Sequence, residues 1–286
     1  MSGKITADMI KELRELTGVA MGKCKEALEQ AQGDMQQAID NLRKAGMASA
    51  VKKEGRETNE GLIGFAQSAK AASLIEVNAE TDFVAQNDKF RAFVQDLAQE
   101  VADTRPASLE AFLAQTYSKD PSLTVDQKRA LVIQSIGENI QIKRIAVVSK
   151  ESDLSIGIYS HMGGKIVVLV ELVGSADQEI FARDIAMHIA AESPEYIGPE
   201  NIPADVIERE KEIAKSQVQG KPAQIADKII EGKVKAFYDQ VCLLGQKYVK
   251  DGNISVADLI LQEGRRIGKT ISVRRFIRWR VGGHGS

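Results

Sequence analysis

This 286-residue chain contains an internal repeat, which limits the folds it can adopt more than any other pattern in its sequence. The run Ile63-Gly64-Phe65 matches Ile156-Gly157-Ile158, and Leu74-Ile75-Glu76-Val77 matches Leu169-Val170-Glu171-Leu172. In each half, these two β-type segments are followed by apolar residues at helical spacing, so the order is strand, turn, strand, loop, helix. Because self-similarity of this kind marks a duplicated supersecondary unit, we expect an α+β fold with two related subdomains and antiparallel sheets.

Other segments complete the two subdomains. Helical spacing predicts helices at residues 109–117, Val125–Ile136 and 256–263, and β-rich composition predicts strands at Ile140–Ser149 and 272–281. Two amphipathic stretches, 203–218 and Ala223–Val241, flank the turn signal Gly220-Lys221-Pro222. They predict a helical hairpin, at about residues 200–241, inserted in the second subdomain.

The first 45 residues have apolar positions at helical spacing in three short blocks separated by glycine. Gly18 and Gly33 suit helix ends, Asp34 suits an N-cap, and Gly46 is expected to stop the third helix. Residues 52–61 are charged and lack large apolar side chains, which indicates a linker. We therefore expect a three-helix module with its linker at 1–54, a first α+β subdomain at 55–150, and a second at 151–286.

Charge and composition exclude several classes of protein. The net charge of -2 provides no global attraction to nucleic acid or to an anionic membrane. The most apolar run, residues 166–173, is interrupted by Glu171 and is far shorter than the roughly 20 residues of a membrane span. Cys24 and Cys242 form no paired motif, which favours reduced thiols, and the first residues resemble no targeting signal. We expect a cytoplasmic protein that does not bind membranes.

Enzyme signatures are weak throughout the chain. The stretch from Gly18 to Lys23 resembles a phosphate loop but has one residue too few between its glycines, and it lies between helices, so an interhelical turn is the better interpretation. His188 and Glu192 have a spacing that can share a metal ion, yet no further ligand is visible nearby. No nucleophile motif or dinucleotide fingerprint occurs. We therefore expect no catalytic residues, no metal and no cofactor.

The last predicted strand carries several arginines. Arg274, Arg278 and Arg280 alternate with apolar residues, although Arg275 and Phe276 interrupt the alternation. A basic strand face could bind nucleic acid, which makes an RNA-binding, ribosome-associated protein the alternative function. A solvated sheet face is the favoured interpretation, since charge there also deters aggregation, so no direct contact with nucleic acid is expected.

The segment at residues 78–90 is the most unusual part of the sequence. It leaves a predicted strand, carries Phe83 among polar residues, and opens a helix with Asn87 or Asp88 as the N-cap. Two interpretations of Phe83 stay open. The ring could fold back against its own helix as a hydrophobic staple, or it could form an exposed wedge for a partner.

At this segment the sequence resembles a known family. The run Thr81-Asp82-Phe83-Val84-Ala85 is similar to the signature loop of bacterial elongation factor Ts, the guanine nucleotide exchange factor of elongation factor Tu. Further similarities follow in the family's order along nearly the whole chain: Leu16-Thr17-Gly18, Cys24-Lys25-Glu26-Ala27-Leu28, Gly33-Asp34, Ala38-Ile39, Ile136-Gly137-Glu138-Asn139-Ile140, the turn at His161, and Met187-His188-Ile189-Ala190-Ala191. The resemblance implies that the N-terminal helices form a ubiquitin-associated-like module and that the helical hairpin is a coiled-coil protrusion.

The resemblance also implies a partner and a binding site. The partner would be elongation factor Tu, GDP-bound or nucleotide-free, with exchange promoted without covalent catalysis. Phe83 would insert into its G domain and Asp82 would meet a neighbouring helix, so that the loop, with Thr81 and Val84, disturbs the magnesium and phosphate site. Further implied contacts are Met21 and Lys25, with Ile136, Gly137, His161 and Val249. A homodimer through the helical hairpin is left open, and Gly22 departs from the larger apolar residue of some relatives.

Overall fold

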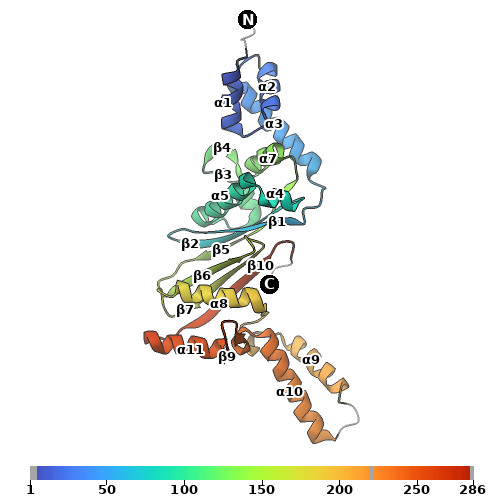
Figure 1. The fold of residues 1–286 in the computed structure, drawn as a ribbon, viewed down its shortest axis with the longest axis vertical. Coiled ribbons are helices and arrows are strands. Elements are labelled where there is room, and N and C mark those ends of the chain that lie inside the picture. Colours follow the sequence, from blue (N-terminus) through green and yellow to red (C-terminus); the bar gives the residue numbers. More distant parts are fainter. Residues whose placement is uncertain (1–4, 219–221, 284–286) are drawn as a thin grey trace. The chain divides into compact units, whose positions relative to one another are not determined.

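The computed structural model describes residues 5–218 and 222–283. The chain divides into two compact units, Met1–Ser149 and Lys150–Ser286. Each unit has one three-stranded antiparallel sheet with helices packed on it (Figure 1). The predicted α+β class, with three N-terminal helices followed by antiparallel sheets, is confirmed. None of the helices in the described residues is long and apolar enough to cross a bilayer.

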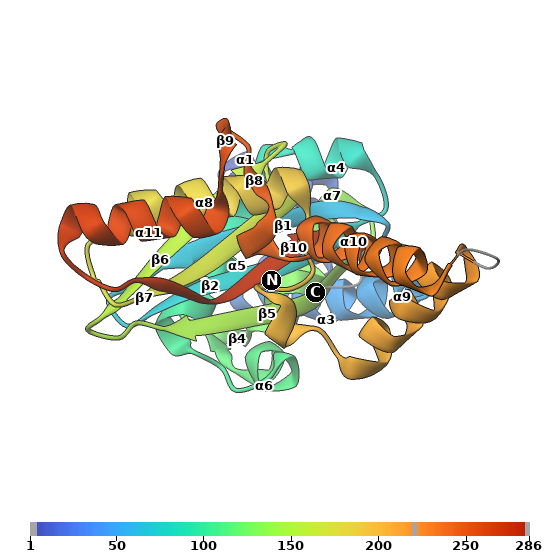
Figure 2. The ribbon, with the colours of Figure 1, turned by 90° about the horizontal axis from the view of Figure 1, so that it is seen from below.

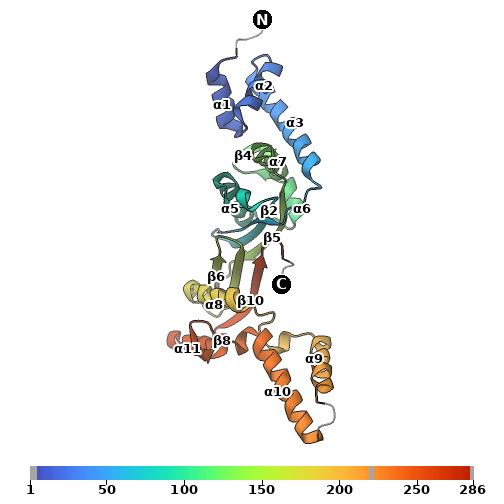
Figure 3. The ribbon, with the colours of Figure 1, turned by 45° about the vertical axis from the view of Figure 1, so that its right-hand side comes forward.

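Three helices open the first unit: α1 (Ala7–Thr17), α2 (Met21–Gln30) and α3 (Met35–Lys53) (Figure 3). Gly18 ends α1 in the left-handed conformation, and the Asp34 carboxylate caps α3 by accepting the Gln37 N–H over 2.8 Å. Both agree with expectation. The small core between the helices contains Leu13, Val19, Cys24, Ala27, Leu28, Ala31, Ala38 and Leu42.

The expectation that Gly46 stops the third helix is wrong, because α3 continues through it to Lys53. A Cβ at Gly46 would lie 3.2 Å from Leu131 Cδ2 and 3.1 Å from Gln134 Oε1, both on helix α7 (Val125–Ile136). The glycine therefore allows α3 and α7 to approach closely, which is a packing role that sequence cannot distinguish from a helix stop. The charged segment predicted as a linker is correspondingly shorter, because its first two residues are helical.

The sheet of the first unit has the order β1-β2-β5. Its strands are β1 (Glu60–Gln67), β2 (Ala71–Ala79) and β5 (Ile140–Ser149). The other elements are α4 (Asp82–Gln86), α5 (Asp88–Thr104), α6 (Leu109–Ala114), β3 (Thr116–Tyr117), β4 (Asp120–Thr124) and α7 (Val125–Ile136). Helix α5 packs on β1 and β2 through the apolar face that its helical spacing predicts.

The helix predicted at residues 109–117 ends early, at Ala114. Thr116 and Tyr117 instead form β3, which pairs with β4 in a small antiparallel hairpin. Tyr117 is only 2% exposed, and its ring packs in the apolar core that α5 and α7 form with the first sheet, which we call the first core. Burial of one aromatic side chain thus overrides the helical pattern, since tertiary contacts outweigh small differences in local propensity.

The second unit repeats this plan with the sheet order β10-β7-β6. Its strands are β6 (Leu154–His161), β7 (Ile166–Val173) and β10 (Ser272–Arg280). Helix α8 (Glu179–Glu192) packs on β6 and β7. The remaining elements are η1 (Pro199–Asn201), α9 (Ala204–Ser216), α10 (Ala223–Val241), η2 (Leu243–Gly245), β8 (Lys247–Tyr248), β9 (Asp251–Ser255) and α11 (Val256–Ile267).

Helices α9 and α10 pack side by side as the predicted hairpin (Figure 2). Of the turn signal predicted between them, Gly220 and Lys221 lie outside the described residues, and Pro222 precedes α10 as its N-cap.

The duplication extends further than the sequence repeat indicated. In each unit a short hairpin precedes a helix, β3–β4 before α7 and β8–β9 before α11. The first N–H of that helix donates to a glutamine carbonyl, from Val125 to Gln115 and from Val256 to Gln246, over 3.0 Å in both. The signal is present in the sequence as Gln-x-Tyr-x-Lys-Asp, starting at residues 115 and 246, but its short strands give no clear β pattern.

Candidate partner-binding site

The segment at residues 80–86 begins where β2 leaves the first sheet. Ala79, the last residue of β2, pairs with Ile140, the first residue of β5. Because these strands are antiparallel, the residues after Ala79 and the residues before Ile140 leave the sheet at the same end. The register therefore places Thr81 beside Glu138, 57 positions later in the chain.

The segment expected to be a loop contains one turn of helix, α4, with Thr81 as its N-cap. Thr81 is extended, and its hydroxyl oxygen accepts the Val84 N–H over 3.4 Å. Val84 and Ala85 are 8% and 1% exposed and pack in the core together with Phe90. Burial of these two apolar residues anchors the turn, which the polar sequence around it did not reveal.

Phe83 projects from this turn with 81% of its surface exposed. Such exposure contradicts the interpretation of Phe83 as a staple packed on its own helix. Asp82 is also exposed, while Asn87 caps α5 by accepting the Lys89 N–H over 2.9 Å. Within the 81–84 segment, Thr81 caps helix α4 and Val84 is buried in the core. Asp82 and Phe83 face solvent. The turn therefore exposes one large apolar side chain and one carboxylate, while burial of Val84 and Ala85 holds its backbone in place.

Ile136 and Gly137 lie at the end of α7, directly before Glu138. Ile136 is partly buried against the first core, and Gly137 is exposed with φ of 95° as the helix C-cap. A residue with a Cβ is strained in that conformation, so glycine suits this helix end. The structure therefore brings Ile136 and Gly137 to the neighbourhood of the 81–84 turn.

The start of α2 is tied to the same end of α7. The Ser135 hydroxyl donates to the Gly18 carbonyl over 2.7 Å, three residues before Met21. Met21 is 46% exposed, and the side chain of Lys25 is 61% exposed beside Glu29 at 3.7 Å. The two residues expected to contact a partner thus lie on the exposed side of a helix whose first turn is near Ile136.

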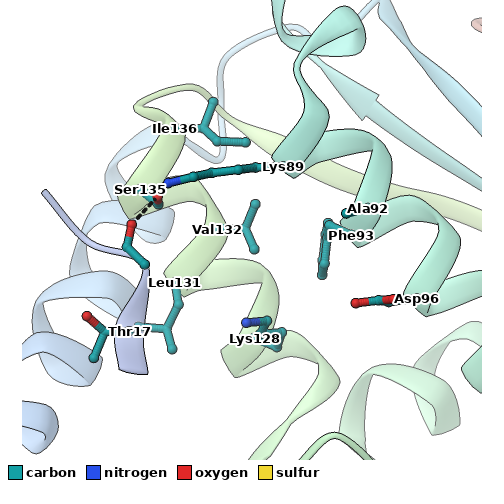
Figure 4. A pocket seen from close by; sticks show the side chains of 11 residues that line it. Thr17, Lys89, Ala92, Phe93, Asp96, Lys128, Leu131, Val132, Ser135 and Ile136 are labelled. Carbon is teal, nitrogen blue, oxygen red and sulfur yellow. Dashed lines mark hydrogen bonds between the residues drawn. The ribbon is translucent and has the colours of Figure 1, made fainter. Parts of the chain in front are cut away.

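A cavity of about 240 Å³ lies beside the hydrogen bond between Ser135 and Gly18 (Figure 4). Its walls come from α5, α7 and the end of α1, and Phe93, Leu131 and Val132 supply apolar surface. Lys89 and Lys128 also line it.

The other two predicted contact residues belong to the second unit. His161 ends β6 at an exposed turn, where its Nδ1 lies 3.4 Å from the Tyr159 hydroxyl, and Met162 beside it is 70% exposed. Val249 lies in the β8–β9 turn and is 44% exposed. The two residues occupy different hairpins of that unit.

The pair His188 and Glu192 does not form a metal site in the structure. His188 is fully buried, its Nδ1 accepts the Val249 N–H over 3.2 Å, and its Nε2 lies 3.0 Å from Gln246 Oε1. Both ring nitrogens are therefore engaged, with Nε2 as the donor of a neutral imidazole. Burial lowers the pKa of His188. Among the described residues no cluster of three or more potential ligands is found.

Acidic residues engage the arginines at the start of β10. Arg274 contacts Glu151 at 3.0 Å and Glu171 at 2.7 Å, and Arg275 also binds Glu171, which is 1% exposed. A register shift between Val273 and Arg275 explains why the alternation of the sequence breaks there. This bulge lets two consecutive arginines reach one carboxylate. Their charges are therefore partly neutralised, which disfavours a nucleic-acid surface at this end of the strand.

Glu80 and Glu138 are functional-site candidates that the sequence alone does not identify as site residues. Glu138 accepts the Thr81 N–H over 3.1 Å, and Glu80 accepts the Asn139 N–H over 2.6 Å. The available signal was the Glu138-Asn139 pair between a helix and a β-type run. It lies between a predicted helix and a predicted strand, but it could not identify which distant segment the Glu138 carboxylate would meet.

Comparisons with known proteins agree with the motif pattern. The family model described as "Elongation factor TS" matches residues 80–283. A protein named elongation factor Ts from Protochlamydia amoebophila is 61% identical over 97% of this chain and 99% of its own length. Proteins of the same name from Chlamydia caviae and Chlamydia trachomatis serovar L2 are 46% and 45% identical, each over 96% of this chain and 98% of their own length.

Proposed function

Because this chain belongs to the elongation factor Ts family of translation elongation factors, we propose that it binds elongation factor Tu and promotes release of GDP. The exposed Phe83 on an anchored turn is the observation that carries this proposal. Phe83 supplies apolar area for a cleft in the partner, and Asp82 supplies a charge beside it. These are the groups needed to disturb a site that holds magnesium and phosphate.

The mechanism requires no covalent chemistry. A nucleoside diphosphate in a G domain is held largely by magnesium and by backbone N–H groups around the phosphates. A partner that displaces these elements weakens nucleotide binding, and by linkage the nucleotide weakens binding of the partner by the same factor. Nucleotide-free elongation factor Tu would then bind this chain most tightly, and GTP in excess would release it.

The other contacts are assigned by the family resemblance. Met21 and Lys25 would contact the G domain, and Ile136, Gly137, His161 and Val249 would add further contacts, in part to another domain of the partner. Their exposure, except for the partly buried Ile136, supports this assignment. Such residues would provide affinity, while the 81–84 turn would provide the displacement.

Release of a fluorescent GDP analogue from elongation factor Tu, in excess unlabelled nucleotide, tests the proposal. We expect the wild-type chain to accelerate release and Phe83→Ala to lower that acceleration about tenfold or more, as for a central binding anchor. Ile180→Ala is the matched control, because Ile180 is also 81% exposed but lies on α8. Unchanged release with Phe83→Ala would contradict the wedge, and no acceleration by folded wild-type protein would favour the RNA-binding alternative.

A further inference from the structure

We propose that Glu138 is a positioning residue that holds the 81–84 turn, and therefore Phe83, in the orientation needed for nucleotide release. This inference rests on the proposed exchange function. It assigns a role to a residue whose carboxylate binds Thr81, two positions before Phe83, and it follows from the hydrogen bonds between the β2–α4 and α7–β5 connections.

The carboxylate of Glu138 binds both donors of the residue that caps α4. Oε2 accepts the Thr81 N–H over 3.1 Å, and Oε1 accepts the Thr81 hydroxyl over 2.7 Å. A carboxylate only accepts hydrogen bonds, so the hydroxyl hydrogen must point at Glu138. The hydroxyl oxygen is then free to accept the Val84 N–H. Glu138 thus orients the cap as well as holding its backbone.

Glu80, in the β2–α4 connection, likewise accepts a hydrogen bond from the α7–β5 connection. Its carboxylate accepts the Asn139 N–H over 2.6 Å and lies 3.3 Å from the Arg56 guanidinium. The Asn139 side chain is fully buried and donates to the Arg56 carbonyl over 2.9 Å. Each connection therefore supplies a carboxylate to the other, and the position of Glu138 is itself fixed by its buried neighbour.

The turn depends on such external ties because it is short. Helix α4 has five residues, and a helix of that length does not persist from its own hydrogen bonds. Phe83 is too exposed for packing to fix its position, so its direction is determined by the backbone on either side. Burial of Val84 and Ala85 holds the later residues, and Glu138 holds the first.

Loss of the Glu138–Thr81 hydrogen bonds would reduce the fraction of molecules in which Phe83 has the orientation needed for binding. The apparent affinity for the partner falls in proportion to that fraction. Glu138→Gln retains the size of the side chain, but its NH2 group cannot accept, so one of the two Thr81 donors loses its acceptor. We expect about a tenfold decrease in stimulated GDP release at low concentrations of this chain, with partial recovery at saturating concentrations. Glu138→Asp, which keeps both acceptors, is expected to lie between Glu138→Gln and wild type.

The matched control is Glu100→Gln in the same unit. Glu100 is 4% exposed and accepts both the N–H and the hydroxyl of Ser118, the same pair of donors that Thr81 offers Glu138. Its substitution is expected to lower the melting temperature at least as much as Glu138→Gln. Stimulated GDP release is expected to remain as in wild type at a temperature where both variants are folded.

Combination with Phe83→Ala separates positioning from direct contact. If Glu138 acts through Phe83, the double variant Glu138→Gln with Phe83→Ala stimulates GDP release from elongation factor Tu as much as Phe83→Ala alone does. If Glu138→Gln causes the same decrease in both backgrounds, or none in wild type, or if Glu100→Gln causes the same decrease, the proposal is overturned.

Hydrogen exchange of the chain alone tests the positioning without any partner. We expect Glu138→Gln to increase exchange of the residue 81–86 amides at least fivefold, whereas Glu100→Gln leaves them unchanged. Suppose that hydrogen exchange is faster in Glu138→Gln but the wild-type chain does not stimulate GDP release. The proposed function would then be refuted, while the role of Glu138 in holding the 81–84 turn would be established. Unchanged exchange at residues 81–86 would refute the tie itself, whatever the release rates.

Discussion

His188 in α8 occupies the same structural position as Glu100 in α5. The Val249 N–H donates to Nδ1 of His188 over 3.2 Å, and the Ser118 N–H donates to Oε1 of Glu100 over 3.1 Å. In both units an aspartate four residues earlier on the helix pairs with the lysine of the same hairpin, at 2.8 Å and 2.6 Å respectively. A histidine and a carboxylate have thus diverged within one duplicated arrangement that anchors a hairpin to a helix.

The neutral imidazole of His188 predicts a pH dependence of stability. Burial lowers the pKa of His188 in the folded protein, whereas an unfolded histidine has a pKa of about 6.5. The unfolded state therefore binds the additional proton first, and the free energy of unfolding decreases as the pH falls below about 6.5. Thermal unfolding between pH 8 and 5.5 is expected to show a steeper decrease for wild type than for His188→Gln. Parallel curves would contradict this linkage.

The buried carboxylate of Glu171 predicts a strongly non-additive pair of substitutions. Arg274 and Arg275 both bind it, so either arginine can still balance its charge when the other is replaced. We expect Arg274→Met and Arg275→Met each to cost about 1 kcal/mol of unfolding free energy, because both guanidinium groups are partly exposed. The double variant should cost about 3–5 kcal/mol, since it leaves a buried charge without a partner. Urea denaturation measures all three, and simple additivity would disprove the shared role.

Close packing of β6 on α8 predicts that Gly157 tolerates no side chain. A Cβ there would lie 2.2 Å from backbone atoms of Ala182 and Arg183, which cannot move without displacing α8. Gly157→Ala is expected to lower the unfolding free energy by about 3 kcal/mol in urea denaturation. Gly232→Ala is the control, because a Cβ at Gly232 meets no atom within 4 Å and alanine favours a helix interior by up to about 1 kcal/mol. Equal effects of the two variants would contradict the packing argument.

The two cysteines are expected to be unreactive in the native protein. Cys24 and Cys242 are 0% and 1% exposed, and burial raises the pKa of Cys242 to about 11 and also raises that of Cys24. Only the thiolate attacks disulfide reagents, so both thiols are protected by exclusion and by protonation. An aromatic disulfide reagent at pH 8 should label neither cysteine in the folded protein and both in guanidinium. Rapid native labelling would show that one of the cores opens.

Much of the fold was predictable because its local patterns are strong. The strand at Ile140–Ser149 and the helices at Val125–Ile136 and Ala223–Val241 have the predicted bounds. Errors arose where tertiary contacts override local preference, as at Tyr117, whose burial ends a helix, and at Gly46, where a glycine serves close helix packing. The short hairpins escaped prediction since two to five residues carry too little periodicity.

The duplicated α+β plan, the helical hairpin and membership of a family could be predicted without a structure, because these depend on periodicity and on motifs contiguous in the chain. The three-dimensional fold was needed to show that Phe83 is exposed, that Val84 beside it is buried, and that Glu138 binds Thr81. The reason is strand register. The pairing of Ala79 with Ile140 brings together two connections that lie far apart in the chain, and no local pattern in either one specifies the other.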